Sequence, residues 1–203
     1  MNKYLSTLLL ITILCTSCSP QPKEEILTPL TSQEETSKEF IFPLEKWAER
    51  VTKKTFWLRV SPKNSPVSPE KFSGYHTGVD FEIIEWEKDA EIAIKTICSG
   101  PLLMKKWATG YGGVVAQKCE FNKEPAIVVY GHLKLASVQT AINTELKAGD
   151  QLGVLGKWYS VETGNERKHL HLSIHKWSEV NIRGYVSTEW ELGQWLNPLE
   201  LLK

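Results

Sequence analysis

The segment "KHLHLSIH", residues 168–175, constrains the fold of this chain more than any other stretch. Apolar residues alternate with polar ones in it, and residues two apart on a β-strand point to the same face of a sheet. One face is apolar, as on the core side of an antiparallel strand, and consists of Leu170, Leu172 and Ile174. The other face holds three of the five histidines of the chain and consists of His169, His171, Ser173 and His175.

Other parts of the chain also predict β-structure. From about residue 72 onward, short runs with alternation or β-branched residues are separated by Gly, Pro and Asp. They are "VDFEII", "EIAIKTIC", "PLLMKKW", "GVVAQKC", "AIVVYGHL" and "QLGVLGK". Helical periodicity is limited to "PLEKWAERV" near the start and "STEWELGQWL" near the end. We therefore predict a mainly antiparallel β domain, and 203 residues are enough for one such domain with a core.

The charge balance argues against one class of function. Lys and Arg together number 24, as do Asp and Glu, so the formal net charge is zero. Domains that bind nucleic acid are usually basic. We therefore expect no nucleic-acid partner. We also expect the chain to be a monomer.

The N-terminus resembles an export signal. An apolar run, residues 8–14, is followed by small residues before Cys18. This arrangement is typical of a secretory signal peptide, and the run is too short for a stable transmembrane helix. The ending "TSC" resembles a bacterial lipobox, in which the cysteine becomes the lipidated first residue, although Cys15 stands where leucine is usual. We expect residues 1–17 to be the signal peptide and Cys18 to carry a lipid anchor at the cell envelope; cleavage near Ser17 without lipidation is the alternative.

The segment after Cys18 is rich in Pro, Ser, Thr and Glu. Such a composition cannot bury enough apolar surface to order itself. We expect residues 18–40 to hold the lipidated cysteine and a flexible tether, and residues 41–203 to form the domain, with its core at 72–198.

Two further cysteines, Cys98 and Cys119, lie in β-like runs on either side of the turn at "TGYGG". Export would place them in an oxidising compartment, where disulfides persist. They could face each other across a hairpin and form a disulfide, or they could be two buried thiols. Neither belongs to a C-x-x-C pair, which argues against a cysteine zinc site.

The segment "GYHTGVDFE" places His76 and Asp80 four residues apart. In a straight strand this spacing spans about 13 Å, but Gly74 and Gly78 bracket the histidine and permit a tight bend. A bend at "HTG" would bring the two side chains together. With a third ligand from another histidine they would leave one position of a tetrahedral zinc ion to water, which is the form of a catalytic site. The same spacing is also common in proteins that bind no metal.

His132 ends the apolar run "VVYGHL". It could be a metal ligand, a proton donor beside a metal, or a surface histidine at a strand end. The pair formed by His169 and His171 has the same ambiguity, because a strand histidine is commonly a surface residue, whereas an H-x-H pair favours zinc.

Taken together and in this order, these patterns resemble the lysostaphin-like (LytM-type) peptidoglycan zinc metalloendopeptidases of the duplicated hybrid motif superfamily. The resemblance covers about residues 72–198 and rests on "HTGVDFE", "GYGGVVAQ", "YGHLKL", "ELKAGDQLGVLGK", "HLHLSI" and "WLNPLE". It implies a small antiparallel β-sheet/barrel-sandwich hybrid domain with an open groove and short peripheral helices. It also implies a hydrolase that cuts the peptide cross-links or stem peptides of bacterial peptidoglycan, the polymer outside the cytoplasmic membrane.

The resemblance assigns one zinc ion per chain to His76, Asp80 and His171. It places His132 and His169 beside the metal as catalytic residues, and which of them is the general base and which stabilises the oxyanion stays open. His175 has no counterpart in the family's site, and we expect it on the surface or along the groove.

Two other functions compete with this interpretation. Some members of the family have lost zinc and regulate cell-wall amidases, but these typically lack one or more of the five site residues, all of which are present here. Zinc D-alanyl-D-alanine peptidases also have a Ser and a His before an Asp, followed later by Glu-x-x-His. This chain has a similar order, with Ser73, His76 and Asp80 followed by "ERKH" at residues 166–169. That class separates its histidine and aspartate more widely and lacks H-x-H, so we interpret Glu166 as a loop residue.

Overall fold

A computed structural model of the chain describes residues 40–201. The predicted signal peptide and the lipidation site Cys18 lie outside the described residues. Every strand pairing within residues 40–201 is antiparallel. The predicted class, a mainly antiparallel β domain with short peripheral helices, is therefore confirmed.

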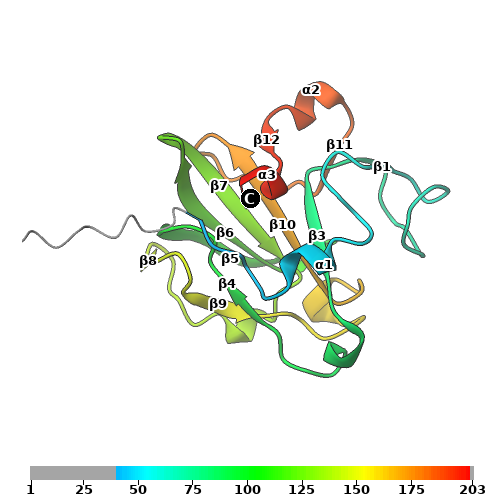
Figure 1. The fold of residues 1–203 in the computed structure, drawn as a ribbon, viewed down its shortest axis with the longest axis horizontal. Helices are drawn as coiled ribbons and strands as arrows, with labels where there is room; N and C mark the ends of the chain where they lie inside the picture. The colour runs from blue at the N-terminus through cyan, green and yellow to red at the C-terminus, as the bar shows by residue number, and fades with distance from the viewer. Residues whose placement is uncertain (1–39, 202–203) are drawn as a thin grey trace, which may run out of the picture. The chain divides into compact units, whose positions relative to one another are not determined.

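Three sheets make up the described part of the chain (Figure 1). The largest has seven strands, with the spatial order β12 (Trp195–Leu196), β10 (His169–Lys176), β7 (Glu124–Gly131), β6 (Gly112–Phe121), β5 (Gly100–Ala108) and β8 (Glu145–Leu146), and with β3 (Gly78–Glu82) also paired to β10. The second sheet contains β1 (Arg59–Val60), β2 (Gly74–His76) and β11 (Tyr185–Val186). The third is a pair, β4 (Ala93–Lys95) and β9 (Gln151–Val154).

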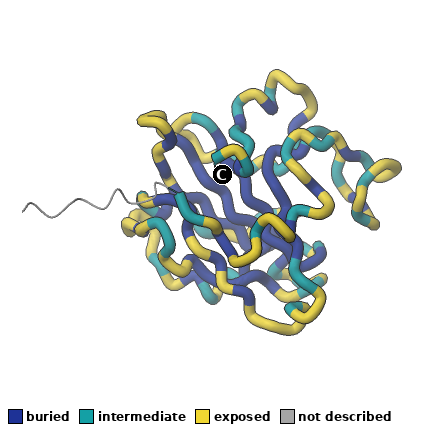
Figure 2. Tube along the Cα trace, viewed as in Figure 1, coloured by how far each residue is buried: buried dark blue, intermediate teal, exposed yellow. Residues whose placement is uncertain are grey.

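The alternation of β10 separates a core face from a polar face, as predicted. The apolar residues of this strand have no exposed surface and belong to the main hydrophobic core, namely Leu170, Leu172 and Ile174. The neighbouring strand β7 contributes Val128 and Tyr130 to the same core, whereas its Ile127 and Val129 belong to a smaller cluster. The histidine face is also buried, and Figure 2 shows the central strands mostly in the colour of buried residues. The polar residues of β10 are therefore held in fixed positions by packing on both faces of the sheet.

The helices are single turns. They are α1 (Trp47–Arg50), α2 (Glu189–Leu192) and α3 (Pro198–Leu201), together with three 3₁₀ turns at Glu85–Glu87, Leu135–Ser137 and Val161–Thr163. The helical pattern "STEWELGQWL" produces only α2 because Thr188 caps its start and Gly193 ends it. No helix between residues 40 and 201 has the length and apolar character that a bilayer crossing requires.

Cys98 and Cys119 lie opposite each other where β5 begins and β6 ends. Their Cα atoms are 6.0 Å apart and their sulfur atoms are joined as a disulfide. The separation is within the usual range for this bond. The arrangement corresponds to the first of the two alternatives given above, a cross-link between the two strands.

Candidate metal centre

His76, Asp80 and His171 come together where the chain passes from one sheet to another. His76 ends β2, which pairs with β1 and β11, whereas Asp80 lies in β3, which pairs with β10. His171 is the direct antiparallel partner of Asp80. The change of sheet at Thr77 supplies the bend that "HTG" predicts, and Thr77 is held there by a hydrogen bond from its hydroxyl to the Arg183 carbonyl oxygen at 2.7 Å.

The facing atoms of these three side chains lie at distances that suit a metal ion. His76 Nε2 is 3.0 Å from His171 Nδ1 and 3.2 Å from Asp80 Oδ1, and the latter two atoms are 3.1 Å apart. Ligand atoms of a tetrahedral zinc ion lie about 3.3–3.6 Å from one another, because each is about 2.0–2.2 Å from the metal. All three side chains are buried. The group is therefore close in size to the coordination shell of zinc.

The hydrogen bond on the far side of His76 determines which form of its ring faces the cluster. His76 Nδ1 lies 3.1 Å from the Thr55 carbonyl oxygen. A carbonyl oxygen only accepts, so Nδ1 carries the proton and the neutral ring presents an electron pair at Nε2. That electron pair faces Asp80 Oδ1, which is also an acceptor. Two acceptors that face each other without a proton between them favour a cation, so the donor set fits a metal ion.

His132 and His169 stand beside the cluster, and backbone carbonyls orient both. His132 Nδ1 lies 3.0 Å from the Thr163 oxygen, and His169 Nδ1 lies 2.8 Å from the Arg167 oxygen. Each neutral ring therefore keeps its electron pair at Nε2. The two ring centroids are 4.1 Å apart. The site thus combines three potential metal ligands with two imidazoles whose basic nitrogens are fixed.

Burial and neighbouring charges set the protonation of the site. Burial lowers the pKa of His132 well below its usual value, with a further lowering from His169. Burial likewise lowers the pKa of His171 to about 4. Burial alone would raise the pKa of the Asp80 carboxyl, but the adjacent side chains of His169, His76 and Arg167, the last with a permanent positive charge, hold it well below its usual range. At neutral pH His132 and His171 are neutral imidazoles and Asp80 is ionised, and these are the forms that bind metals and accept protons.

Arg167 and Glu82 belong to the site although the sequence analysis did not identify them. Arg167 Nη2 donates to Asp80 Oδ2 at 2.7 Å and to Glu82 Oε1 at 2.6 Å, and its Nε donates to both oxygens of Glu82. This bridge holds Oδ2 of Asp80, which also lies 3.3 Å from His169 Nε2, and leaves Oδ1 facing His76 and His171. A signal was present in the sequence, because Arg167 lies two residues before His169 and Glu82 two residues after Asp80. At this spacing Glu82 shares a face of β3 with Asp80, whereas Arg167 precedes β10 and its contact with Glu82 depends on the register of β3 and β10.

A cavity of about 290 Å³ borders Asp80, His132, His169 and His171. Aromatic side chains form part of its wall. The Tyr111 ring centroid is 5.2 Å from that of His171, and Gly131 leaves room for it because a Cβ there would lie 2.4 Å from the Tyr111 ring. The buried Tyr111 hydroxyl has no hydrogen-bond partner among residues 40–201. A bound group in this cavity could satisfy it.

The remaining predicted residues lie apart from the cluster. His175 is buried rather than on the surface, and it borders a hollow other than the metal cavity, so its expected place along the groove stays a prediction. Glu166 lies in the loop before β10, as expected; it lines the same cavity as the cluster without belonging to it and pairs with Lys71 at 2.9 Å. Cys18 precedes the described residues, and its lipidation stays a prediction.

Comparison with protein families and curated proteins gives one match. The model of peptidase family M23 matches residues 74–183, which is more than half of the chain. This range contains all five residues assigned to the site by the resemblance. No curated protein matches the sequence.

Solved structures provide the second comparison. The catalytic domain of the antimicrobial peptidase lysostaphin from Staphylococcus simulans is 18% identical, with 79% of this chain and 98% of that domain covered and a TM-score of 0.52. LytU is 23% identical, with 73% of this chain and 81% of LytU covered and a TM-score of 0.47. The likeness to the lysostaphin domain shows a shared fold.

Proposed function

Because the chain belongs to peptidase family M23, we propose that it is a zinc-dependent endopeptidase that hydrolyses peptide cross-links or stem peptides of bacterial peptidoglycan. One observation carries the proposal. Three buried donor atoms, from His76, Asp80 and His171, lie 3.0–3.2 Å from one another beside two histidines of fixed orientation. Lysostaphin, whose catalytic domain has the same fold, is itself described as an antimicrobial peptidase.

We assign the metal to His76 Nε2, Asp80 Oδ1 and His171 Nδ1, with one zinc ion per chain. When bound, zinc supplies the Lewis acidity that activates a water molecule and polarises a peptide carbonyl. The protein contributes the orientation of its ligands. The Thr55 carbonyl oxygen holds the His76 ring, and Arg167 holds the Asp80 carboxylate, as outer partners of metal ligands commonly do.

His132 and His169 move the protons in this proposal. Each presents Nε2 as an acceptor, because its Nδ1–H is committed to a backbone carbonyl. One of them takes the proton of the attacking water at Nε2 and passes it to the departing amine. The other donates to the oxyanion that develops on the peptide carbonyl only after it has taken up a proton from solvent at Nε2, because its Nδ1–H is committed to a backbone carbonyl. The Tyr111 hydroxyl is a further donor for that oxyanion, since it lines the cavity and has no partner within the described part of the chain.

The cellular location that we propose for this chain fits the same function. We propose that residues 1–17 direct export, that Cys18 anchors the protein to a membrane and that residues 18–40 tether the domain 41–203 to it. This arrangement would bring the site to the peptidoglycan of the cell envelope. An exported protein would also meet the oxidising conditions in which a Cys98–Cys119 disulfide persists.

The test combines zinc analysis with digestion of isolated peptidoglycan. We expect one zinc per purified chain, together with new peptide termini that mass spectrometry of the released fragments would identify. Removal of zinc with a chelator should abolish release, and zinc should restore it. Zinc without release from peptidoglycans of several cross-link types would refute hydrolysis, and absence of both would favour the alternative of an amidase regulator.

A further inference from the structure

His175 has no role in the proposed metal site, but it borders a second hollow of about 760 Å³. Ile182 and Arg183 line both this hollow and the metal cavity, so the two lie next to each other. The polar face of β10 leads from one to the other, because His171 and His175 lie on the same side of the strand. A substrate bound at the metal can therefore extend into this hollow.

The hollow contains a buried polar atom without a partner. His175 is only 5% exposed, and its Nδ1 makes no hydrogen bond of good geometry among the described residues, although the Glu179 backbone and the Gln194 side chain lie near the ring. Its ring packs against Trp195 with centroids 4.7 Å apart. On the other side, Asn181 Nδ2 lies 3.4 Å from His175 Nε2. An unpartnered nitrogen at this depth costs free energy unless a bound group or water satisfies it.

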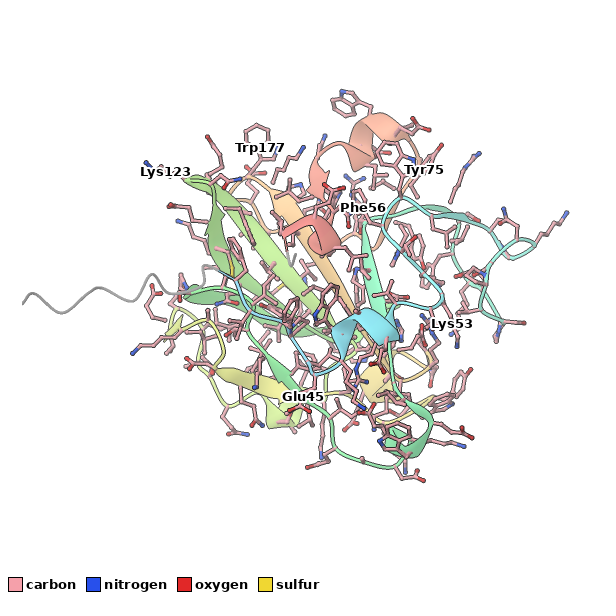
Figure 3. All side chains as sticks on the ribbon, in the orientation of Figure 1. Glu45, Lys53, Phe56, Tyr75, Lys123 and Trp177 are labelled. Atoms are coloured by element: carbon pink, nitrogen blue, oxygen red, sulfur yellow. A yellow bond between two sulfur atoms is a disulfide. The ribbon has the colours of Figure 1, made fainter. Side chains whose placement is uncertain are left out.

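Trp177 forms an exposed wall of the same hollow. Its side chain is 62% exposed, and in Figure 3 it projects beyond the end of β10. Its backbone has a φ of 79°, which is unusual for a bulky residue, and its N–H donates to the Pro125 carbonyl oxygen at 3.0 Å. Strained residues of this kind cluster at ligand-binding sites. The backbone thus holds Trp177 at the edge of the hollow, with its indole accessible to solvent.

The backbone of β10 cannot recruit a peptide strand at this place. Ile174 and His175 pair with β12 on one side and with β7 on the other, so the strand has no free edge there. Strand addition to β10 is therefore excluded, and the lining offers one indole face together with hydrogen-bonding groups, among them those of Asn181, Arg183 and Gln194. A sugar ring matches this set, because its C–H face stacks on an aromatic ring while its hydroxyl and acetamido groups donate and accept at the rim.

We propose that this hollow is a subsite for a saccharide ring, with Trp177 as its stacking platform and His175 and Asn181 as hydrogen-bonding partners. The inference rests on the proposed function in one respect, namely that the saccharide belongs to the glycan strand to which the cleaved peptide is attached. It implies that the enzyme recognises peptidoglycan as a glycopeptide rather than as a free peptide.

The first test is direct binding. Trp177→Asn removes the indole but keeps a residue that tolerates positive φ, so the backbone need not change. Trp190→Ala is the matched control, because Trp190 in α2 is 78% exposed and does not line the hollow. NMR titration of the full chain with an N-acetylglucosamine oligosaccharide should shift the Trp177 indole N–H signal. The binding should disappear in Trp177→Asn and persist in Trp190→Ala; its absence in the unaltered chain, or its persistence in Trp177→Asn, would overturn the proposal.

The second test separates the subsite from the peptidase activity. The same peptide is supplied free and attached to its disaccharide. Trp177→Asn should raise KM for the glycopeptide about three- to tenfold and leave cleavage of the free peptide unchanged. Equal losses on both substrates would mean that the hollow holds peptide, and the saccharide assignment would be wrong. If neither substrate is cleaved by the unaltered chain, the proposed function fails while the oligosaccharide titration still decides the subsite.

Discussion

Arg167 is the residue whose removal tests the architecture of the site most severely. Its buried guanidinium bridges Asp80 and Glu82, two carboxylates that are 2% and 8% exposed. Replacing one partner of a buried ion pair typically costs about 3–5 kcal/mol, because the other partner is left as an uncompensated charge. Lys53 lies 3.5 Å from Glu82 and its side chain is 42% exposed, so it compensates part of that charge. We therefore expect Arg167→Gln to lower the free energy of unfolding by about 3 kcal/mol, the lower end of that range.

Urea unfolding of the metal-free chain near neutral pH measures this effect without a contribution from zinc binding. A loss of about 3 kcal/mol corresponds to a fall in melting temperature of about 6–12 °C for a domain of this size. Lys134→Gln is the control, since Lys134 pairs with Glu91 at 3.3 Å and both side chains are well exposed. Such surface pairs contribute less than about 1 kcal/mol. Adding Glu82→Gln to Arg167→Gln should recover part of the loss, because it removes one of the unpaired charges. An Arg167→Gln loss no larger than that of the control would refute the reasoning.

Four further predictions test other parts of the account. His171→Ala should remove zinc and hydrolysis together, whereas His169→Ala should retain zinc and lower activity at least about 100-fold. Zinc analysis together with the peptidase assay distinguishes the two variants. Full activity in His169→Ala would show that this residue has no catalytic role. Metal-free protein should lose stability as the pH falls from about 6.5 to about 4, because burial lowers the pKa of His171 in the folded chain to about 4 while the unfolded chain takes up the proton near pH 6.5. The loss is on the order of 3 kcal/mol in urea titrations across that range, and constant stability would contradict it. Cys18→Ser should release the protein from membranes in cell fractionation, and continued retention would defeat the lipid anchor. Alkylation of the unfolded, unreduced chain should label neither Cys98 nor Cys119, and labelling of both would show free thiols.

Which side chains of a strand face the core could be predicted from the sequence, because the alternation that decides it is a local pattern. Alternation in "KHLHLSIH" depends only on the period of two of a β-strand, and Leu170 and Leu172 are fully buried on the core side as expected. The bend at "HTG" was likewise visible from its glycines. The convergence of His76, Asp80 and His171 needed more than local pattern, and the resemblance to a family supplied it.

Other features of the site depend on which strands lie side by side, and no local pattern contains that information. Tyr111 appeared only as part of a turn, yet it lies against His171 because Gly131 of β7 is the cross-strand partner of that histidine and leaves room for the ring. Arg167 and Glu82 meet because His169 pairs with Glu82 across β3 and β10. Long-range register of this kind comes from the packing of the whole sheet rather than from any one segment.

The burial of His175 has the same explanation. The sequence left it on the surface or along the groove, and the structure covers it with Trp195 from β12, a strand far along the chain. The two-residue length of β12 made it invisible as a strand signal. Short strands that gain their stability from tertiary contacts are the elements that propensity cannot identify.

X-ray absorption at the zinc edge of the zinc-reconstituted full chain tests the central claim most directly. We expect one zinc per chain, coordinated by two imidazole nitrogens at about 2.0–2.1 Å and by oxygen, with no sulfur. The same spectrum should persist in His169→Ala and be lost in His171→Ala. Sulfur in the coordination shell, or an unchanged spectrum in His171→Ala, would contradict the assignment of the metal to His76, Asp80 and His171.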